Sequence, residues 1–150
     1  MKNNKGFSLV ELIIVIAIMA ILVGVMAPQL IKYIEKGKVS SDAQLADTVH
    51  TAMVTAMMDP EIVNMKDSGI PTNSQSGLLT SLTAGKSYTS AVMETLGVSA
   101  LTQVNSSLKS NGASNISFQV INGNTISVWI PGTDSRGSKS TGATYNIQVK

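Results

Sequence analysis

The sequence predicts an α+β fold in which a long N-terminal helix packs on a small C-terminal antiparallel sheet. An uncharged apolar run extends from Leu12 to Ile31, and residues 32–58 continue with apolar side chains at three- and four-residue spacing. The last third instead alternates apolar and polar residues, which is the period of a strand. A helix and a sheet that each have one apolar face can bury both faces against each other.

The apolar run is long enough to cross a membrane as a helix, because about 20 predominantly apolar residues span the hydrocarbon core. Lys2 and Lys5 precede the run and favour a cytoplasmic N-terminus. Lysines also follow the run: Lys32, Lys36 and Lys38. Charge alone therefore does not determine the orientation.

The start of the run resembles a known processing signal. The segment Gly6-Phe7-Ser8-Leu9-Val10-Glu11-Leu12-Ile13 is similar to the class III signal peptide of type IV pilins and pseudopilins. This resemblance implies a pilin-like fold and a leader peptide of residues 1–6. It also implies cleavage between Gly6 and Phe7 by a prepilin peptidase, and N-methylation of Phe7.

Glu11 is an acid within this apolar segment, where a charge is costly and usually has a partner. The resemblance implies that Glu11 serves subunit assembly by meeting the N-terminus of a neighbouring subunit. After cleavage the amine of Phe7 would lie one helical turn before Glu11, within reach on the same helix or on an adjacent one. A second interpretation stays open, in which Glu11 lies at the wet interface and only favours the helix N-terminus.

Gly24 and Pro28 lie late in the apolar run. Proline removes a helical hydrogen bond and glycine adds backbone freedom, so we expect a helix kink here. The resemblance also implies a kink at Pro28.

Residues 32–58 predict a continuation of the helix through a polar collar at residues 32–38 and then an amphipathic stretch. The apolar stripe is expected at Val39, Ala43, Ala46, Val49, Met53, Ala56 and Met57. The opposite, polar face is expected at Ser41, Asp42, Asp47, Thr48, Thr51 and Thr55. Asp59-Pro60 predicts the end of the helix.

The rest of the chain predicts a loop, helices and a sheet. Residues 64–86 are rich in Ser, Thr, Asn and Gly and predict a loop, with Leu78, Leu79 and Leu82 as anchors of a short turn. Residues 88–108 predict a helix split at Gly97. Alternation over 116–120, 126–130 and 145–149 predicts three strands, with Asn122-Gly123 as the hairpin turn between the first two.

The sequence offers little for catalysis, because the chain has no cysteine and one histidine, His50. His50 is expected in the core or at its boundary. We expect no enzyme, no cofactor and no metal site. The loop of residues 131–142 has a single acid, Asp134, which is too few for calcium. Removing Lys2 and Lys5 from the 11 basic residues leaves nine, equal to the 9 acidic residues, so no nucleic-acid binding is expected.

We therefore expect a leader at 1–6, a transmembrane and assembly helix at 7–31, and a globular head at 32–150. The head divides into a helix at 32–58, a loop with short helices at 60–112, and a sheet at 115–150. The resemblance implies a structural subunit of a type IV pilus that polymerises through its N-terminal helix for adhesion, motility or surface attachment.

The implied partners are further copies in a helical filament, the prepilin peptidase, and inner-membrane and cytoplasmic assembly machinery with an ATPase. Before assembly the chain would cross the cell membrane once, with a cytoplasmic N-terminus. After assembly it would lie in an extracellular pilus. Two alternatives stay open: a pseudopilin of a type II secretion or competence (DNA-uptake) system, and a singly membrane-anchored binding domain.

Overall fold

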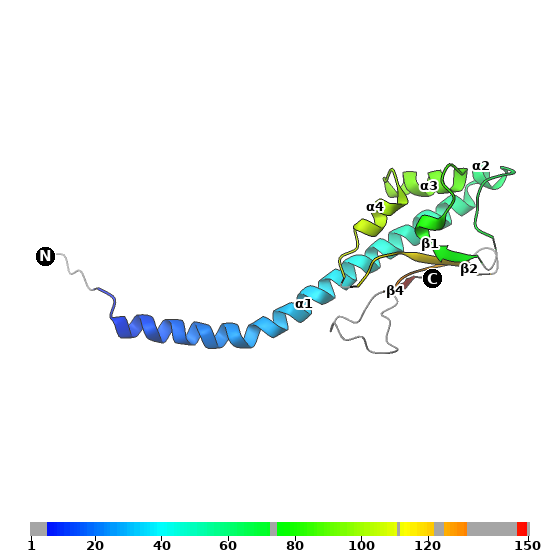
Figure 1. Cartoon of the computed structure of the whole chain (residues 1–150). Coiled ribbons are helices and arrows are strands. Elements are labelled where there is room, and N and C mark those ends of the chain that lie inside the picture. Colours follow the sequence, from blue (N-terminus) through cyan, green and yellow to red (C-terminus); the bar gives the residue numbers. More distant parts are fainter. Residues whose placement is uncertain (1–5, 73–74, 111, 122–124, 132–146, 150) are drawn as a thin grey trace. The chain divides into compact units, whose positions relative to one another are not determined.

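The structure is a computed structural model that describes residues 6–72, 75–110, 112–121, 125–131 and 147–149. The chain divides into two units, Met1–Ile34 and Glu35–Lys150, and helix α1 (Leu9–Met58) contributes to both (Figure 1). The elements after α1 are α2 (Pro60–Val63), β1 (Ser76–Leu78), the 3-10 helix η1 (Leu79–Ser81), α3 (Ser87–Leu96), α4 (Leu101–Ser106), β2 (Ser117–Ile121), β3 (Thr125–Ile130) and β4 (Ile147–Val149).

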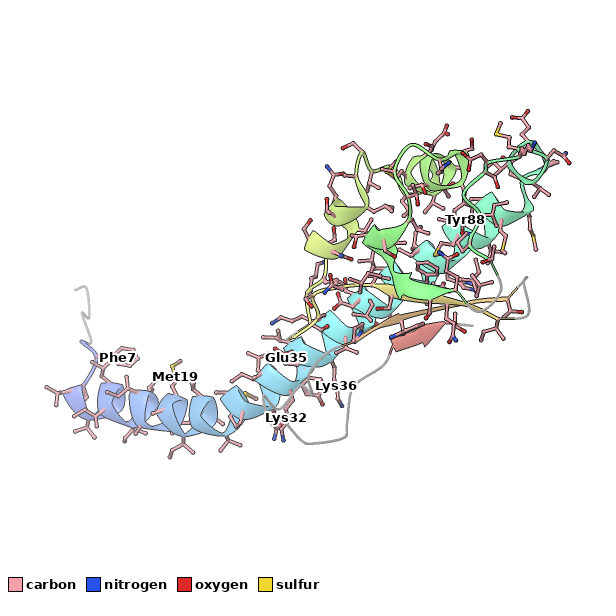
Figure 2. All side chains as sticks on the ribbon, turned by 45° about the vertical axis from the view of Figure 1, so that its right-hand side comes forward. Phe7, Met19, Lys32, Glu35, Lys36 and Tyr88 are labelled. Carbon is pink, nitrogen blue, oxygen red and sulfur yellow. The ribbon has the colours of Figure 1, made fainter. Side chains whose placement is uncertain are left out.

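In the first unit every described residue is exposed, and the chain is helical from Leu9 onward. Among the described helices, α1 is the one that is long and apolar enough to cross a membrane, by length and composition. Figure 2 shows its apolar side chains projecting outward, with Phe7 and Met19 labelled. Because the first unit buries none of them, this surface needs lipid or other protein around it.

In the second unit, one face of α1 is buried in the core. Its buried residues are Asp42, Ala46, Val49, Ala52, Met53 and Ala56. The predicted stripe is largely confirmed, although Val39, Ala43 and Met57 are only half-buried. The prediction that Asp42 lies on the polar face was wrong, because its side chain is completely buried. Asp42 precedes Ala46 by one helical turn, so it extends the buried stripe.

The sheet contains four antiparallel strands in the order β1-β2-β3-β4. Phe118 and Val120 of β2 alternate with more polar positions and point into the core, as do Ile126, Val128 and Ile130 of β3. The β2–β3 pairing in register Ile121↔Thr125 confirms the predicted hairpin strands. The hairpin turn at Asn122-Gly123 and the loop containing Asp134 lie outside the described residues.

The core joins the two helical pieces and the sheet to α1. The buried cluster that contains Val49 of α1 also contains residues of α3 and α4: Tyr88, Val92, Leu101 and Val104. Figures 1 and 2 show α3 and α4 on one side of α1 and strands β2 to β4 on the other. The α+β fold with a long helix on a small antiparallel sheet is therefore confirmed.

The prediction of a loop at 64–86 missed strand β1, whereas the 3-10 helix η1 lies at the predicted short turn. Strand β1 has no alternating apolar pattern, and main-chain hydrogen bonds hold the segment around it. The Val120 N–H donates to the Gln75 carbonyl at 2.9 Å, and the Leu79 N–H donates to the Ile116 carbonyl at 2.7 Å. Such pairing depends on the backbone more than on side-chain type, so the amino-acid composition of this segment did not indicate a strand.

Two predicted boundaries are confirmed with a clear local cause. Helix α1 ends at Met58, where Asp59 is extended and its carboxylate accepts the N–H of Glu61 at 2.9 Å. Pro60 then occupies the first turn of α2, where a missing N–H does no harm. Helix α3 ends at Leu96, and Gly97 follows with a left-handed φ of 67°, which favours glycine.

Candidate functional site: the N-terminal segment

The carboxylate of Glu11 folds back onto the start of its own helix. Glu11 Oε2 accepts a hydrogen bond from the main-chain N–H of Ser8 at 2.9 Å. The Ser8 carbonyl in turn accepts the N–H of Leu12 at 3.2 Å. Ser8 therefore occupies the position before the first helical residue, and Ser8-x-x-Glu11 forms the acid half of a capping box.

This geometry bears on both interpretations of Glu11. An acid in the first turn satisfies an otherwise unpaired N–H and favours the positive end of the helix dipole. The bonded N–H belongs to the residue directly after Phe7, so the carboxylate already lies beside the main chain that would carry a new amine. The capping role of Ser8 was not predicted, although the spacing Ser-x-x-Glu is a recognised signal for it.

The predicted cleavage bond joins two exposed residues outside the helix. Gly6 and Phe7 are exposed and precede α1, and Phe7 is 82% exposed. A bond in exposed, non-helical backbone is accessible to a peptidase. Residues 1–5 of the expected leader lie outside the described residues, and cleavage and methylation stay predictions.

Gly24 and Pro28 both lie within α1, which is assigned as helix through both positions. A side-chain carbon built at Gly24 would meet nothing within 4 Å. Among residues 6–34, which the structure describes in the first unit, no close contact requires glycine at this position. The kink at Gly24 and Pro28 stays a prediction.

The polar collar after the apolar run contains an ion pair. Lys38 Nζ lies 3.1 Å from Glu35 Oε1, one turn earlier on α1. Figure 2 labels Glu35 together with Lys36 and Lys32. The side chains of Lys38 and Glu35 are 40% and 19% exposed, so the pair is half-buried. Both residues lie on α1, so the pair supports this stretch of the helix locally.

The described residues contain no group of three or more His, Asp and Glu side chains that could hold a metal ion. His50 is half-buried on α1, as expected for a boundary position. Among the titratable groups of the described residues, Tyr88 shows a clear shift in pKa, because burial raises the pKa of its phenol. Its hydroxyl donates to the main-chain carbonyl of Met53 at 3.1 Å, which gives it a structural role.

Comparisons with known proteins concern mainly the N-terminal segment. A family model described as "Prokaryotic N-terminal methylation motif" matches residues 1–27. A fimbrial protein of Moraxella nonliquefaciens is 44% identical over 55 residues, which cover 37% of this chain and 36% of that protein. The match thus covers about a third of that relative's length. No solved structure matches the chain.

Proposed function

We propose that this chain, whose N-terminal segment is that of the type IV pilin and pseudopilin family, is a structural subunit of a type IV pilus. The observation that carries the proposal is the exposed apolar half of α1 with Glu11 at its start. Every described residue from Gly6 to Ile34 is exposed. This surface is the size and character of a membrane helix and equally of a helix packed among copies of itself.

In this proposal the membrane holds the subunit before assembly and neighbouring copies cover it afterwards. The prepilin peptidase cleaves between Gly6 and Phe7 and methylates Phe7. The leader at 1–6, the assembly helix at 7–31 and the head at 32–150 are the segments on which these steps act. The assembly machinery and its ATPase supply the energy, because apolar helices gain little by leaving lipid for other apolar helices.

Glu11 selects the register of the incoming subunit. A carboxylate in hydrocarbon is costly unless it meets a cation. The capping contact to Ser8 holds the carboxylate beside the Phe7 main chain. From there it can pair with the amine of Phe7 in its own chain before assembly and in a neighbour afterwards. Gly24 and Pro28 let the helix bend as it packs.

The outer surface of the filament would carry adhesion, motility or surface attachment. The pseudopilin of a secretion or DNA-uptake system shares the same N-terminal chemistry. A singly anchored binding domain would share only the apolar helix. Each of these alternatives predicts its own result for the state and location of the N-terminus.

The test is mass spectrometry of the N-terminus of protein from sheared surface filaments and from membranes. A chain that begins at methylated Phe7 in long filaments supports the pilus subunit. Processed Phe7 found only in membranes supports the pseudopilin. An intact leader, in cells that process other prepilins, overturns both the pilus subunit and the pseudopilin. That result supports the singly anchored binding domain.

A further inference from the structure

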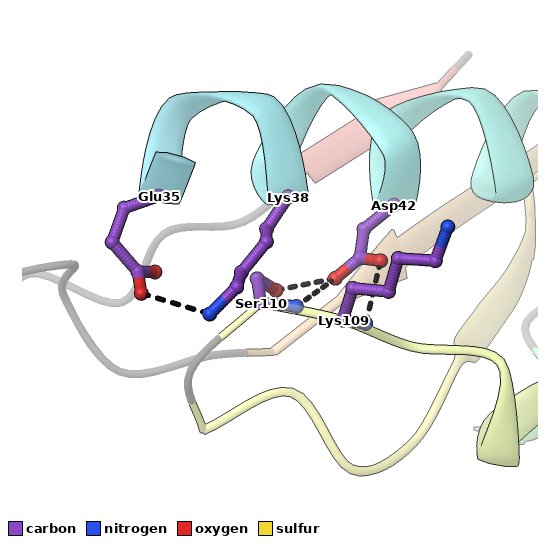
Figure 3. Close-up of polar contacts among 5 residues, drawn as sticks. All are labelled: Glu35, Lys38, Asp42, Lys109 and Ser110. Atoms are coloured by element: carbon purple, nitrogen blue, oxygen red, sulfur yellow. Dashed lines mark hydrogen bonds and ion pairs between the residues drawn. The ribbon is translucent and has the colours of Figure 1, made fainter. Parts of the chain in front are cut away.

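Asp42 is the first completely buried residue of α1, counted from the N-terminus. Its carboxylate binds the segment that follows α4 (Figure 3). Oδ1 accepts the main-chain N–H of Lys109 at 2.9 Å, and Oδ2 accepts the main-chain N–H of Ser110 at 2.8 Å. The hydroxyl of Ser110 also donates to Oδ2.

These bonds join parts of the chain that are far apart in sequence, with separations of 67 and 68 residues. All three donors are neutral groups, two amides and a hydroxyl. Hydrogen bonds to an ionised acceptor are roughly twice as strong as neutral ones. A buried carboxylate without such hydrogen-bond donors would be costly. The three bonds therefore stabilise the contact between α1 and the segment that follows α4.

The segment that Asp42 holds is also closed by bonds of its own. Asn105 Nδ2 donates to Asn115 Oδ1 at 3.2 Å, and the Ile116 N–H donates to Asn105 Oδ1 at 3.1 Å. The connection between α4 and β2 therefore has an internal clamp that does not involve α1. Loss of the Asp42 contact should free this connection from α1 and leave its internal clamp in place.

We propose that Asp42 is a latch that fixes the α4–β2 connection to α1 and carries tension from α1 into the second unit. Residues 35–41 of α1 are exposed or half-buried, so tension that enters along α1 meets a fully enclosed contact first at Asp42. The chain has no cysteine, so no disulfide can carry this load. The tension-bearing role rests on the proposed filament function, whereas the latch itself does not.

The latch is tested by hydrogen exchange with mass spectrometry on the full-length chain in detergent. Asp42→Asn puts an amide where a carboxylate accepted three bonds. Peptides that contain Lys109 and Ser110 should exchange about tenfold faster or more. Ser110→Ala, which removes only the hydroxyl donor, should give a smaller increase.

Asp47→Asn is the matched control, because Asp47 is an exposed acid on the same helix. It should leave exchange at Lys109 and Ser110 unchanged. Unchanged exchange in Asp42→Asn, or the same increase in Asp47→Asn, would overturn the latch. Faster exchange spread evenly over the second unit in both Asp42→Asn and Ser110→Ala would also overturn it, as general destabilisation.

The tension-bearing role is tested with a cysteine pair, Asp42→Cys with Ser110→Cys. The chain has no native cysteine that could form a competing disulfide. Filaments of Asp42→Asn should fragment more readily under shear than wild-type filaments. The oxidised pair should restore their length, and reduction should abolish that rescue. Equal fragmentation of the wild-type, Asp42→Asn and oxidised cysteine-pair filaments overturns the tension-bearing role. If the wild-type chain forms no filaments, the proposed function fails, while the exchange experiment still decides the latch.

Discussion

The phenol hydroxyl of Tyr88 on α3 donates a hydrogen bond to the main-chain carbonyl oxygen of Met53 on α1, at 3.1 Å. Tyr88 is completely buried, and burial raises the pKa of its phenol above the ordinary value of 10.0. Above that ordinary value the unfolded chain loses the phenol proton and the folded chain keeps it. The contribution of Tyr88 to the free energy of unfolding is therefore fully present at neutral pH and falls as the pH rises past 10.0.

The Tyr88→Phe variant should lose both the hydrogen bond and this pH dependence. At neutral pH its free energy of unfolding should fall by about 1 kcal/mol. Above about pH 10 its stability should fall less steeply than that of wild type. Denaturant unfolding of the full-length chain in detergent, followed by circular dichroism across this range, checks both effects. Parallel curves for the two proteins at alkaline pH would contradict the assignment.

Replacements of Glu11 separate its capping role from its charge. Glutamine at this position can still accept the Ser8 N–H, as in a capping box, but it carries no charge. Alanine removes both the charge and the acceptor. If Glu11 pairs with an amine, filament yield should fall at least about tenfold in both Glu11→Gln and Glu11→Ala.

Filament yield is measured by shearing cells and quantifying the processed subunit, with membrane levels of the subunit as the control for expression. Normal assembly of Glu11→Gln together with failure of Glu11→Ala would mean that capping is the role of Glu11. Normal assembly of both variants would remove Glu11 from the assembly mechanism.

The sheet core should be sensitive at Phe118 and tolerant at Ile121 on the same strand. Phe118 is 1% exposed and Ile121 is 38% exposed. Phe118→Ala should lower the free energy of unfolding by about 3–5 kcal/mol, through lost burial and a remaining cavity. Ile121→Ala should cost less than about 1 kcal/mol. Similar midpoints of thermal unfolding for the two variants would contradict the packing of β2 on α1.

Two glycine replacements should act in opposite directions. Gly97 has a φ of 67°, so Gly97→Ala should destabilise the chain by about 1 kcal/mol. Gly37 lies within α1, and a side-chain carbon built there meets nothing within 4 Å. Gly37→Ala should therefore stabilise the isolated chain by about 0.5–1 kcal/mol. Thermal unfolding in detergent measures both, and a loss of stability in Gly37→Ala would reveal a packing role for that glycine.

The sequence by itself determined the elements that depend on local pattern. The apolar run from Leu12 to Ile31, the amphipathic stretch after it and the alternating strands 116–120 and 126–130 predicted the α+β architecture. Asp59-Pro60 and Gly97 predicted two helix ends. Each of these features depends on the backbone preference or the side-chain periodicity of neighbouring residues, which the sequence displays directly.

Only the tertiary structure decided the roles of β1 and Asp42. Strand β1 is held by main-chain hydrogen bonds to distant residues, so its composition resembles a loop. Asp42 is charged and was assigned to the polar face, yet the amides of Lys109 and Ser110 make its burial favourable. Those donors come from a segment more than sixty residues away. Burial of a charge depends on partners that the fold brings together, and local pattern contains no information about them.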